Sequence, residues 1–296
     1  MKITFWSMVL CFILPLPAHA CDVCGCVGSG GLSLMPHQQS SFVGLSWQSL
    51  RSSRETPASS SVDHFQLLGL QLNWKASERL QLMTVLPYRI NTLHQEDQPF
   101  RAEGLGDMSL MLMYRLLPGL APSLSPYTYT LDVGLGLKLP TGEFQDEIQL
   151  TALPTNYQLG SGSLDYLGRL RYTLAKANWN YQLDIFGRWT TVNSSGYRFG
   201  DQLSIHAFLG YWYRRVGYSV MLYTGLYTEY LSQDVQEGYY QFFTGGNGQY
   251  LSTGLESLVG ENYALGVNFQ PPITQNYAQG NIVAKSRFQF RLSYLF

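Results

Sequence analysis

The C-terminal segment 287–296 alternates between apolar and polar residues almost without a break. Its even positions are all apolar, namely Phe288, Phe290, Leu292, Tyr294 and Phe296. Its odd positions are polar or charged apart from Leu295. A period of two predicts an extended strand whose two faces meet different solvents. Because the alternation recurs along the chain, it indicates a transmembrane β-barrel and not a single amphipathic strand.

This alternation predicts an all-β fold, an antiparallel up-and-down transmembrane barrel of about 12 strands. Most of the alternating segments have about ten residues or more, enough for a tilted strand to cross a bilayer. The predicted strands are residues 41–51, 62–74, 79–90, 105–116, 127–140, 163–174, 178–191, 202–213, 218–230, 249–259, 263–270 and 285–296.

Short and long connections alternate between these strands. The short series is 75–78, 175–177, 214–217 and 260–262, with 118–126, of middling length, in the same series. The long series is 52–61, 91–104, 141–162, 192–201, 231–248 and 271–284. Outer-membrane barrels have short periplasmic turns and longer external loops. The long connections are therefore expected outside the cell, and both termini in the periplasm.

Charged side chains on these strands are expected to point into the barrel. An arginine on the lipid face costs about 2–4 kcal/mol at the bilayer midplane, and a slip of one residue would turn every side chain to the other face. Lipid should contact the aromatic side chains Phe288, Phe290, Tyr294 and Phe296. The candidates for lining the lumen and setting selectivity are Lys138, Asp165, Arg169, Arg171, Asp184, Arg188, Glu256, Arg287 and Arg291. These groups either line a water-filled pore or form ion-pair ladders that fill a narrow barrel.

Composition supports the same fold class. Aromatic residues make up 14% of the chain, with 21 tyrosines, which suits the aromatic girdles at the two membrane interfaces. Charged residues make up 13%, about half of their usual share in soluble domains, which argues against a soluble secreted sandwich. The net charge of -1 gives no sign of a nucleic-acid partner.

The first residues are typical of a targeting segment. A positive start, an apolar run and the small-x-small site Ala18-His19-Ala20 predict a signal peptide that is removed before Cys21. The expected organisation is a signal peptide over 1–20, a Cys/Gly-rich periplasmic tail over 21–39 and a transmembrane barrel over 40–296.

Three cysteines, Cys21, Cys24 and Cys26, lie close together in the predicted tail. Because the periplasm is oxidising, two of them are expected to form a disulfide that leaves one odd thiol. Close thiolates can instead hold a soft metal, Cu(I) or Zn(II), with His37 as a fourth ligand. Lipidation of Cys21 is the third alternative, although Ala18-His19-Ala20 is a poor lipobox.

Ser204 and His206 share one face of a predicted strand. A serine and a histidine, with an asparagine, act near the outer rim of an outer-membrane phospholipase of similar strand number. Facing residues recur by chance on strands, so a lumen histidine without a catalytic role is the favoured interpretation. No catalytic residue is predicted, and a hydrolase is the less favoured hypothesis.

Three segments carry a resemblance to a known family. They are Leu105-Gly106-Asp107 with its following strand, Gly136-Leu137-Lys138-Leu139-Pro140-Thr141-Gly142-Glu143, and Gln158-Leu159-Gly160-Ser161-Gly162-Ser163 with Asp165. Together they resemble the meta-pathway-of-phenol-degradation, or transporter-like, outer-membrane family, and a subgroup of it with an N-terminal Cys-x-x-Cys-Gly-Cys tail. The resemblance implies a barrel that passes small hydrophobic molecules. The same residues also read as strand ends and turns, since Pro cannot continue a ladder and Gly tolerates unusual φ.

These patterns lead to one functional hypothesis and one main alternative. The hypothesis is a bacterial outer-membrane channel for passive passage of a small, hydrophobic or aromatic solute. Its expected partners are outer-membrane lipid, that solute and, because the terminal Phe296 resembles an assembly signal, the barrel-assembly machinery. The alternative is a closed structural barrel whose Cys tail is metal- or redox-active.

Overall fold

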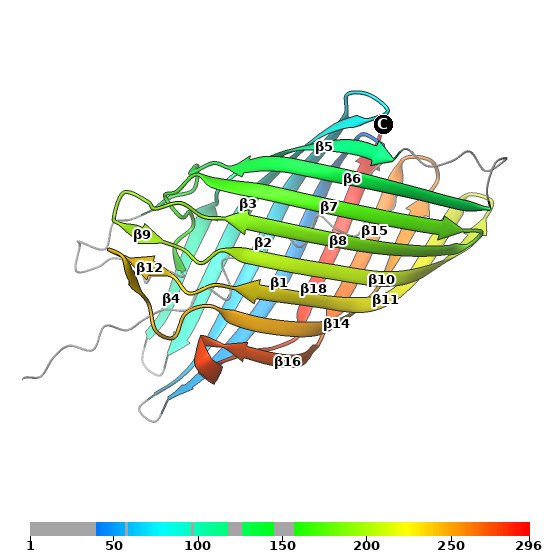
Figure 1. Cartoon of the computed structure of the whole chain (residues 1–296). Coiled ribbons are helices and arrows are strands. Elements are labelled where there is room, and N and C mark those ends of the chain that lie inside the picture. Colours follow the sequence, from blue (N-terminus) through cyan, green and yellow to red (C-terminus); the bar gives the residue numbers. More distant parts are fainter. Residues whose placement is uncertain (1–39, 57–58, 96–97, 118–125, 145–156) are drawn as a thin grey trace, which may run out of the picture.

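The computed structural model describes residues 40–56, 59–95, 98–117, 126–144 and 157–296. These residues form a closed antiparallel barrel with 12 strands in its wall (Figure 1). The strands are β1 (Phe42–Thr56), β2 (Ser59–Lys75), β3 (Leu80–Gln95), β4 (Gln98–Leu105), β5 (Ser109–Leu117), β6 (Tyr127–Lys138), β7 (Asp165–Lys176), β8 (Trp179–Trp189), β9 (Tyr197–Arg198), β10 (Gln202–Arg215), β11 (Tyr218–Leu231), β12 (Val235–Gln236), β13 (Tyr239–Tyr240), β14 (Gly246–Val259), β15 (Tyr263–Gln270), β16 (Pro272–Tyr277), β17 (Ile282–Ala284) and β18 (Arg287–Leu295).

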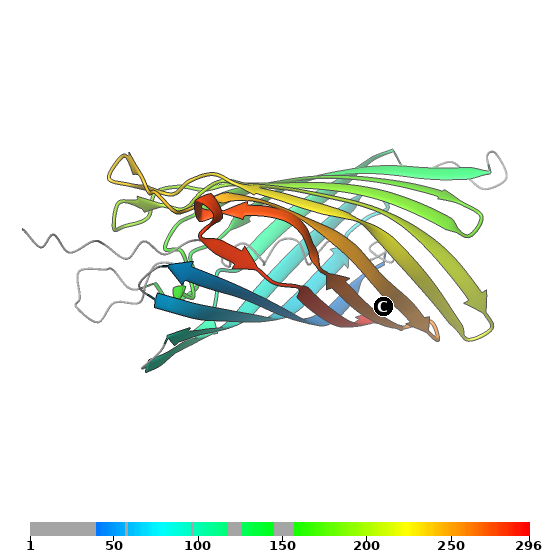
Figure 2. The ribbon, with the colours of Figure 1, turned by 90° about the horizontal axis from the view of Figure 1, so that it is seen from below.

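The first and last wall strands close the cylinder. β18 pairs antiparallel with β1, with Phe42 opposite Leu295 and Ser49 opposite Phe288 (Figure 2). β18 also pairs with β15 on its other side. Every wall strand therefore has two hydrogen-bonded neighbours, which is the condition for backbone in a hydrocarbon environment. Among the described residues, no helix is long and apolar enough to cross a membrane.

The two faces of the wall follow the predicted alternation. On β7, Tyr166 is 54% exposed and Leu170 36%, whereas the neighbouring inward residues Arg169 and Arg171 are buried. The last strand behaves in the same way, because Phe288 and Phe290 are exposed toward lipid and Arg291 is buried. The register inferred from charge and apolar spacing is confirmed.

Three predicted external loops are wrong in part, because they contain strands. Most of segment 52–61 belongs to the paired ends of β1 and β2. β4 continues the line of β5 and pairs with the outer half of β3, so most of segment 91–104 is strand. Likewise β16 pairs with the outer end of β14 and β17 with β1, within segment 271–284. The extensions by β4, β16 and β17 carry the ladder beyond an irregular point in the strand. The alternation of the membrane-spanning part stops at that point, which is why periodicity alone placed loops there.

The predicted loops 192–201 and 231–248 contain a small separate sheet. β12 pairs with β13 and with β9, and the sheet lies at the end of the barrel opposite the C-terminus (Figure 1). Its β13 hairpin exposes Tyr239, Tyr240 and Phe242, each more than 60% exposed. Two-residue strands of this kind leave no alternation in the sequence.

On the lipid face, one tryptophan covers two glycines. A Cβ built on Gly168 would lie 2.8 Å from the Trp189 ring, and one on Gly187 would lie 2.9 Å from it. The indole therefore lies flat on the backbone of β7 and β8, where glycine leaves room. Such an aromatic cover compensates for the packing that glycine removes from a strand.

Candidate functional site

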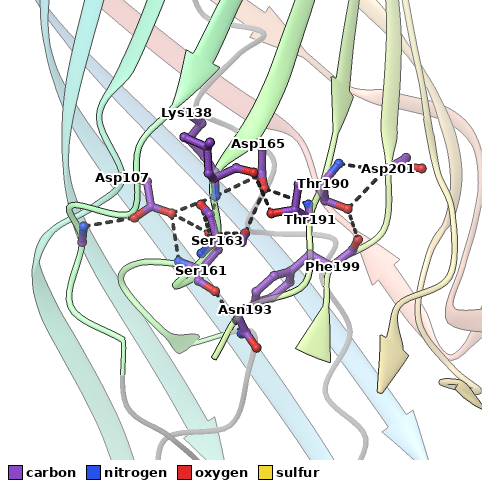
Figure 3. Close-up of polar contacts among 12 residues, drawn as sticks. Asp107, Lys138, Ser161, Ser163, Asp165, Thr190, Thr191, Asn193, Phe199 and Asp201 are labelled. Carbon is purple, nitrogen blue, oxygen red and sulfur yellow. Dashed lines mark hydrogen bonds and ion pairs between the residues drawn. The ribbon is translucent and has the colours of Figure 1, made fainter. Parts of the chain in front are cut away.

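The outer end of the barrel holds a polar cluster of Asp107, Lys138, Ser161, Ser163 and Asp165, which we call the rim cluster (Figure 3). Its members come from the three segments that carry the family resemblance. Asp107 lies between β4 and β5, Lys138 ends β6, and Asp165 begins β7. Segments distant in sequence thus meet at one point of the wall.

Lys138 is the charged centre of this cluster. Its Nζ lies 2.9 Å from Asp107 Oδ2 and 2.8 Å from Asp165 Oδ2, and it donates to Ser161 Oγ. Asp107 accepts two further bonds from backbone amides, 3.0 Å from Gly142 N and 2.9 Å from Ser161 N. The cation and both carboxylates are almost completely buried, so their mutual pairing replaces water.

These contacts set the ionisation of Asp107. Burial alone would raise the pKa of its carboxyl, but the Lys138 ammonium and the donors of Ser161 favour the charged form more strongly. The pKa of Asp107 therefore lies below its ordinary value, and the carboxylate is charged at neutral pH.

Three glycines allow the backbone segments to meet around Asp107. A Cβ on Gly142 would lie 2.8 Å from Gly160 Cα and 2.9 Å from the carbonyl carbon of Gly106, and one on Gly160 would lie 2.6 Å from Gly142 O. No larger residue fits such backbone-to-backbone contact. The glycines of the three motifs are therefore explained by close approach, in agreement with a structural role.

Deeper in the barrel, a row of cross-strand neighbours runs around the inner face from β5 to β10. Arg115 lies opposite Asp132, Asp132 opposite Arg171, Arg171 opposite Asp184, and Asp184 opposite His206. Arg115 Nε lies 2.8 Å from Asp132 Oδ1, and Arg171 Nε lies 3.1 Å from Asp184 Oδ2. We call this set the charged row. It forms the ladder of alternating charge that the sequence left open as an alternative to a water-filled pore.

Arg169 adds a second cation to the same carboxylate. Its Nε lies 2.9 Å from Asp184 Oδ2 and 3.1 Å from Oδ1. Within the described part of the chain, its Nη1 and Nη2 have no hydrogen-bond partner, and neither has Arg171 Nη2. Two guanidinium groups thus share one carboxylate, and three of their nitrogens point to no acceptor.

An apolar cluster lies beside this arginine pair inside the barrel. It comprises Met83, Val85, Met111, Met113, Leu167 and Phe186. Phe186 is the cross-strand neighbour of Arg169, and Gly134 is its neighbour on the other side. A Cβ on Gly134 would come within 2.3 Å of Met113 Sδ and 3.3 Å of Arg169 Cβ. Methionine and arginine side chains therefore converge over this glycine, an arrangement that the alternation along the chain does not predict.

The far side of the lumen holds two more buried ion pairs. Arg287 Nη1 lies 3.0 Å from Glu229 Oε2, and Arg287 Nη2 lies 2.7 Å from the Tyr250 hydroxyl. Arg291 pairs with Glu256 across Gly266, over whose backbone the Glu256 carboxylate lies. These arginines point inward, as predicted, and both are paired.

The other predicted positions differ in burial. Arg188 is half-buried on β8, opposite Gln202 of β10. The lipid-facing Tyr294 and Phe296 are exposed. Ser204 and His206 are buried on the inner face of β10. Cys21, Cys24 and Cys26, the signal peptide and the tail lie outside the described residues, and among those described no group of three metal-binding side chains occurs.

Tyr157 is a buried residue that the alternation along the chain did not predict. Tyr157 lies in the predicted external loop 141–162, yet its ring is buried and its hydroxyl donates to Asp63 Oδ1 at 2.5 Å. Asn91 Nδ2 donates to the Tyr157 carbonyl at 3.1 Å. The loop therefore returns into the barrel mouth before it reaches the rim cluster. The sequence signal for this contact is Asp63, a carboxylate at an inward-facing position of β2 that needs a hydrogen-bond donor.

The comparisons with known proteins concern the fold. No family model matches the chain, and no curated protein matches its sequence. Among solved structures, an outer membrane channel from Pseudomonas putida is similar with a TM-score of 0.63 and 14% identity, covering 89% of this chain and 97% of that one. The chain folds as a bacterial outer-membrane β-barrel.

Two other solved barrels are less similar to this outer-membrane β-barrel. The translocator domain of the autotransporter NalP from Neisseria meningitidis has a TM-score of 0.43 and 12% identity, with 91% of this chain and 92% of that chain covered. The NanC porin has a TM-score of 0.41 and 11% identity, with 85% and 98% covered.

Proposed function

We propose that the barrel is a passive channel for a small solute. The observation that supports it most directly is the surplus of positive charge at mid-height, where Arg169 and Arg171 share the carboxylate of Asp184. A purely structural ladder is expected to balance its charges, because an unpaired buried charge is costly. Side chains at a constriction set selectivity in other pores. The fold of the Pseudomonas putida channel accords with this function.

The route begins at the outer end of the barrel. A solute would pass the rim cluster, then the apolar cluster around Met111 and Met113, and then the arginine pair. The inner face is tightly packed at each level, since Met111, Met113 and Arg171 are all less than 5% exposed. The channel would therefore conduct slowly and admit one small molecule at a time.

Planar bilayers test this proposal. Purified protein should pass ions, and the double variant Arg169→Ala with Arg171→Ala should shift preference toward cations, because it removes the surplus positive charge. Arg79→Ala, in the exposed turn before β3, is the matched control and should leave preference unchanged. Bilayers that stay silent with folded wild-type protein would contradict the channel.

A closed barrel with a functional Cys tail remains the second candidate. It is favoured by the buried pairing of Arg115 with Asp132 and of Lys138 with Asp107 and Asp165, which braces the lumen. In that case Cys21, Cys24 and Cys26 would hold Cu(I) or Zn(II) or cycle between thiol and disulfide. Metal content of wild type against a Cys24→Ser, Cys26→Ser variant would decide between a metal tail and none.

Membership of the transporter-like family is part of the same proposal. It is supported by the three motif segments, which meet in one rim cluster. Contacts within that cluster explain why these residue types occur at the motif positions. A hydrolase is less well supported, because the side chains of Ser204 and His206 are both buried, at 4% and 3% exposure. A lipase assay with Ser204→Ala and His206→Ala would detect such activity.

A further inference from the structure

The arginine pair in the lumen has the properties of an anion-binding site. Arg169 is 5% exposed and Arg171 4%. Among the residues that the structure describes, Arg169 Nη1, Arg169 Nη2 and Arg171 Nη2 have no acceptor. A buried guanidinium normally finds an acceptor for each N–H, because a desolvated donor without a partner is costly. The arrangement therefore presents a fork of donors that matches a planar oxyanion.

Other arginines of the lumen differ from this pair. Arg115 uses both Nε and Nη2 on Asp132, at 2.8 and 3.4 Å. Arg287 uses both terminal nitrogens on Glu229 and one on Tyr250. Both of these guanidinium groups use terminal nitrogens within the protein. Arg169 reaches its carboxylate with Nε alone, which leaves its terminal nitrogens for another partner.

The surroundings of Arg169 indicate what that partner carries besides its charge. Met113 Sδ and Met111 Sδ lie against Gly134 together with Arg169 Cβ. Phe186 and Leu167 complete the apolar side of this site. Methionine side chains are unbranched and adaptable, so they can move aside for an apolar group. Donors on one side and an adaptable apolar wall on the other suit an amphipathic ligand.

We propose that this site binds a small carboxylate with an apolar, aromatic or aliphatic body. The carboxylate accepts hydrogen bonds from Arg169 Nη1 and Nη2 and from Arg171 Nη2. The body lies against Met111, Met113 and Phe186. This inference rests on the proposed channel for the route of entry and names the solute class. An inorganic anion would leave the apolar wall unused, and a neutral apolar molecule would leave the donors unpaired.

Equilibrium titration measures binding without requiring conduction. Folded full-length protein in a non-ionic detergent is titrated calorimetrically with benzoate, with the neutral isostere benzamide, and with sulfate. Benzoate should bind at least about tenfold more tightly than either control ligand, because each lacks half of the recognition. Heat-dependent migration of the barrel in gel electrophoresis reports folding of each sample.

The variants Arg169→Lys and Arg171→Lys keep the positive charge and remove the fork of donors. Each should weaken benzoate binding by about tenfold or more, because an ammonium cannot replace a planar guanidinium at such a site. Arg287→Lys is the matched control, a buried arginine on the far side of the lumen that pairs with Glu229, and it should change affinity less than about threefold.

Three results would overturn the proposal. They are benzamide binding as tightly as benzoate, sulfate binding as tightly as benzoate, and unchanged benzoate affinity in a folded Arg169→Lys or Arg171→Lys variant. A silent bilayer together with specific benzoate binding would reject the channel and keep the site. Conduction without benzoate binding would do the reverse.

Discussion

The rim cluster and the arginine pair are both buried, charged and built across neighbouring strands, yet they differ in the ratio of positive to negative charges. In the rim cluster, Lys138 lies between two carboxylates, and Asp107 is also held by backbone amides of the adjoining segments. In the arginine pair, Arg169 and Arg171 lie against one carboxylate, that of Asp184. Charges that are neutralised within the protein hold the wall together, whereas positive charge in excess of the carboxylates is available to a solute. Stability measurements can separate these two roles.

The largest effect is expected from Lys138→Met. This change leaves Asp107 and Asp165 as facing buried carboxylates without their cation. Breaking a buried ion pair in this way costs about 3–5 kcal/mol. Urea unfolding of the barrel in detergent, followed by tryptophan fluorescence, measures the loss. A folded variant with wild-type stability would show that the rim cluster does not brace the wall.

Acid should weaken the rim cluster through Asp107. The pKa of this carboxyl is lowered, so its contribution to stability is complete above the ordinary Asp pKa and is lost as pH falls through the lower folded value. Unfolding midpoints measured from pH 7 downward should therefore start to decline near pH ~4. In Asp107→Asn the decline should be smaller. An equal acid decline in both proteins would assign it to other carboxyls.

A smaller effect is expected from Thr141→Val. Met108 N donates to Thr141 Oγ1 at 2.8 Å, which ties the start of β5 to the end of β6. The hydroxyl also donates to Gly106 O at 3.3 Å, so the change removes two hydrogen bonds, each worth about 0.5–1.5 kcal/mol. The same unfolding assay measures it, with Thr141→Ser as the control that keeps the hydroxyl. A Ser variant as unstable as the Val variant would show that the hydroxyl is not the cause.

The smallest effect on stability is expected from Arg169→Met. Asp184 keeps its bond to Arg171 Nε, so no carboxylate is left unpaired. Replacing a buried charged group by an apolar one of similar volume is often neutral or stabilising, and the new side chain would join the cluster around Met113 and Phe186. A change within about 1 kcal/mol is expected. A loss as large as that of Lys138→Met would remove the contrast between the two regions.

Much of the fold could be predicted from periodicity because the membrane imposes it. Tyr166 and Leu170 face lipid and Arg169 and Arg171 face inward, as their alternation requires. Irregular points were not predictable in the same way. β4 and β5 form one line interrupted near Asp107, and β16 and β17 extend the wall where loops were expected. Outside the hydrocarbon layer both faces of a strand meet water, so polarity need not alternate. The sequence of a strand there cannot be distinguished from that of a loop.

The candidate site could be predicted as a set of inward residues but not as partnerships. Lys138 and Asp165 were both assigned to the lumen, and the structure shows that Lys138 pairs with Asp165 and with Asp107. The sequence did not indicate that Arg169 would donate to Asp184 through Nε alone, or that Met113 would lie over Gly134. Pairing across strands depends on shear and side-chain direction, which a linear pattern does not contain.

By itself, the sequence determined that this chain is a barrel of strands with an apolar outer face. Successive residues of each strand face lipid and lumen in turn, so they must alternate in polarity. Only the tertiary structure decided which lumen charges are neutralised by other side chains and where positive charge exceeds negative charge. It brought Gly106, Gly142 and Gly160 into backbone contact and placed two arginines on one carboxylate. The physical reason is register, since the pairing of each strand with its two neighbours fixes the height of its inward side chains relative to theirs.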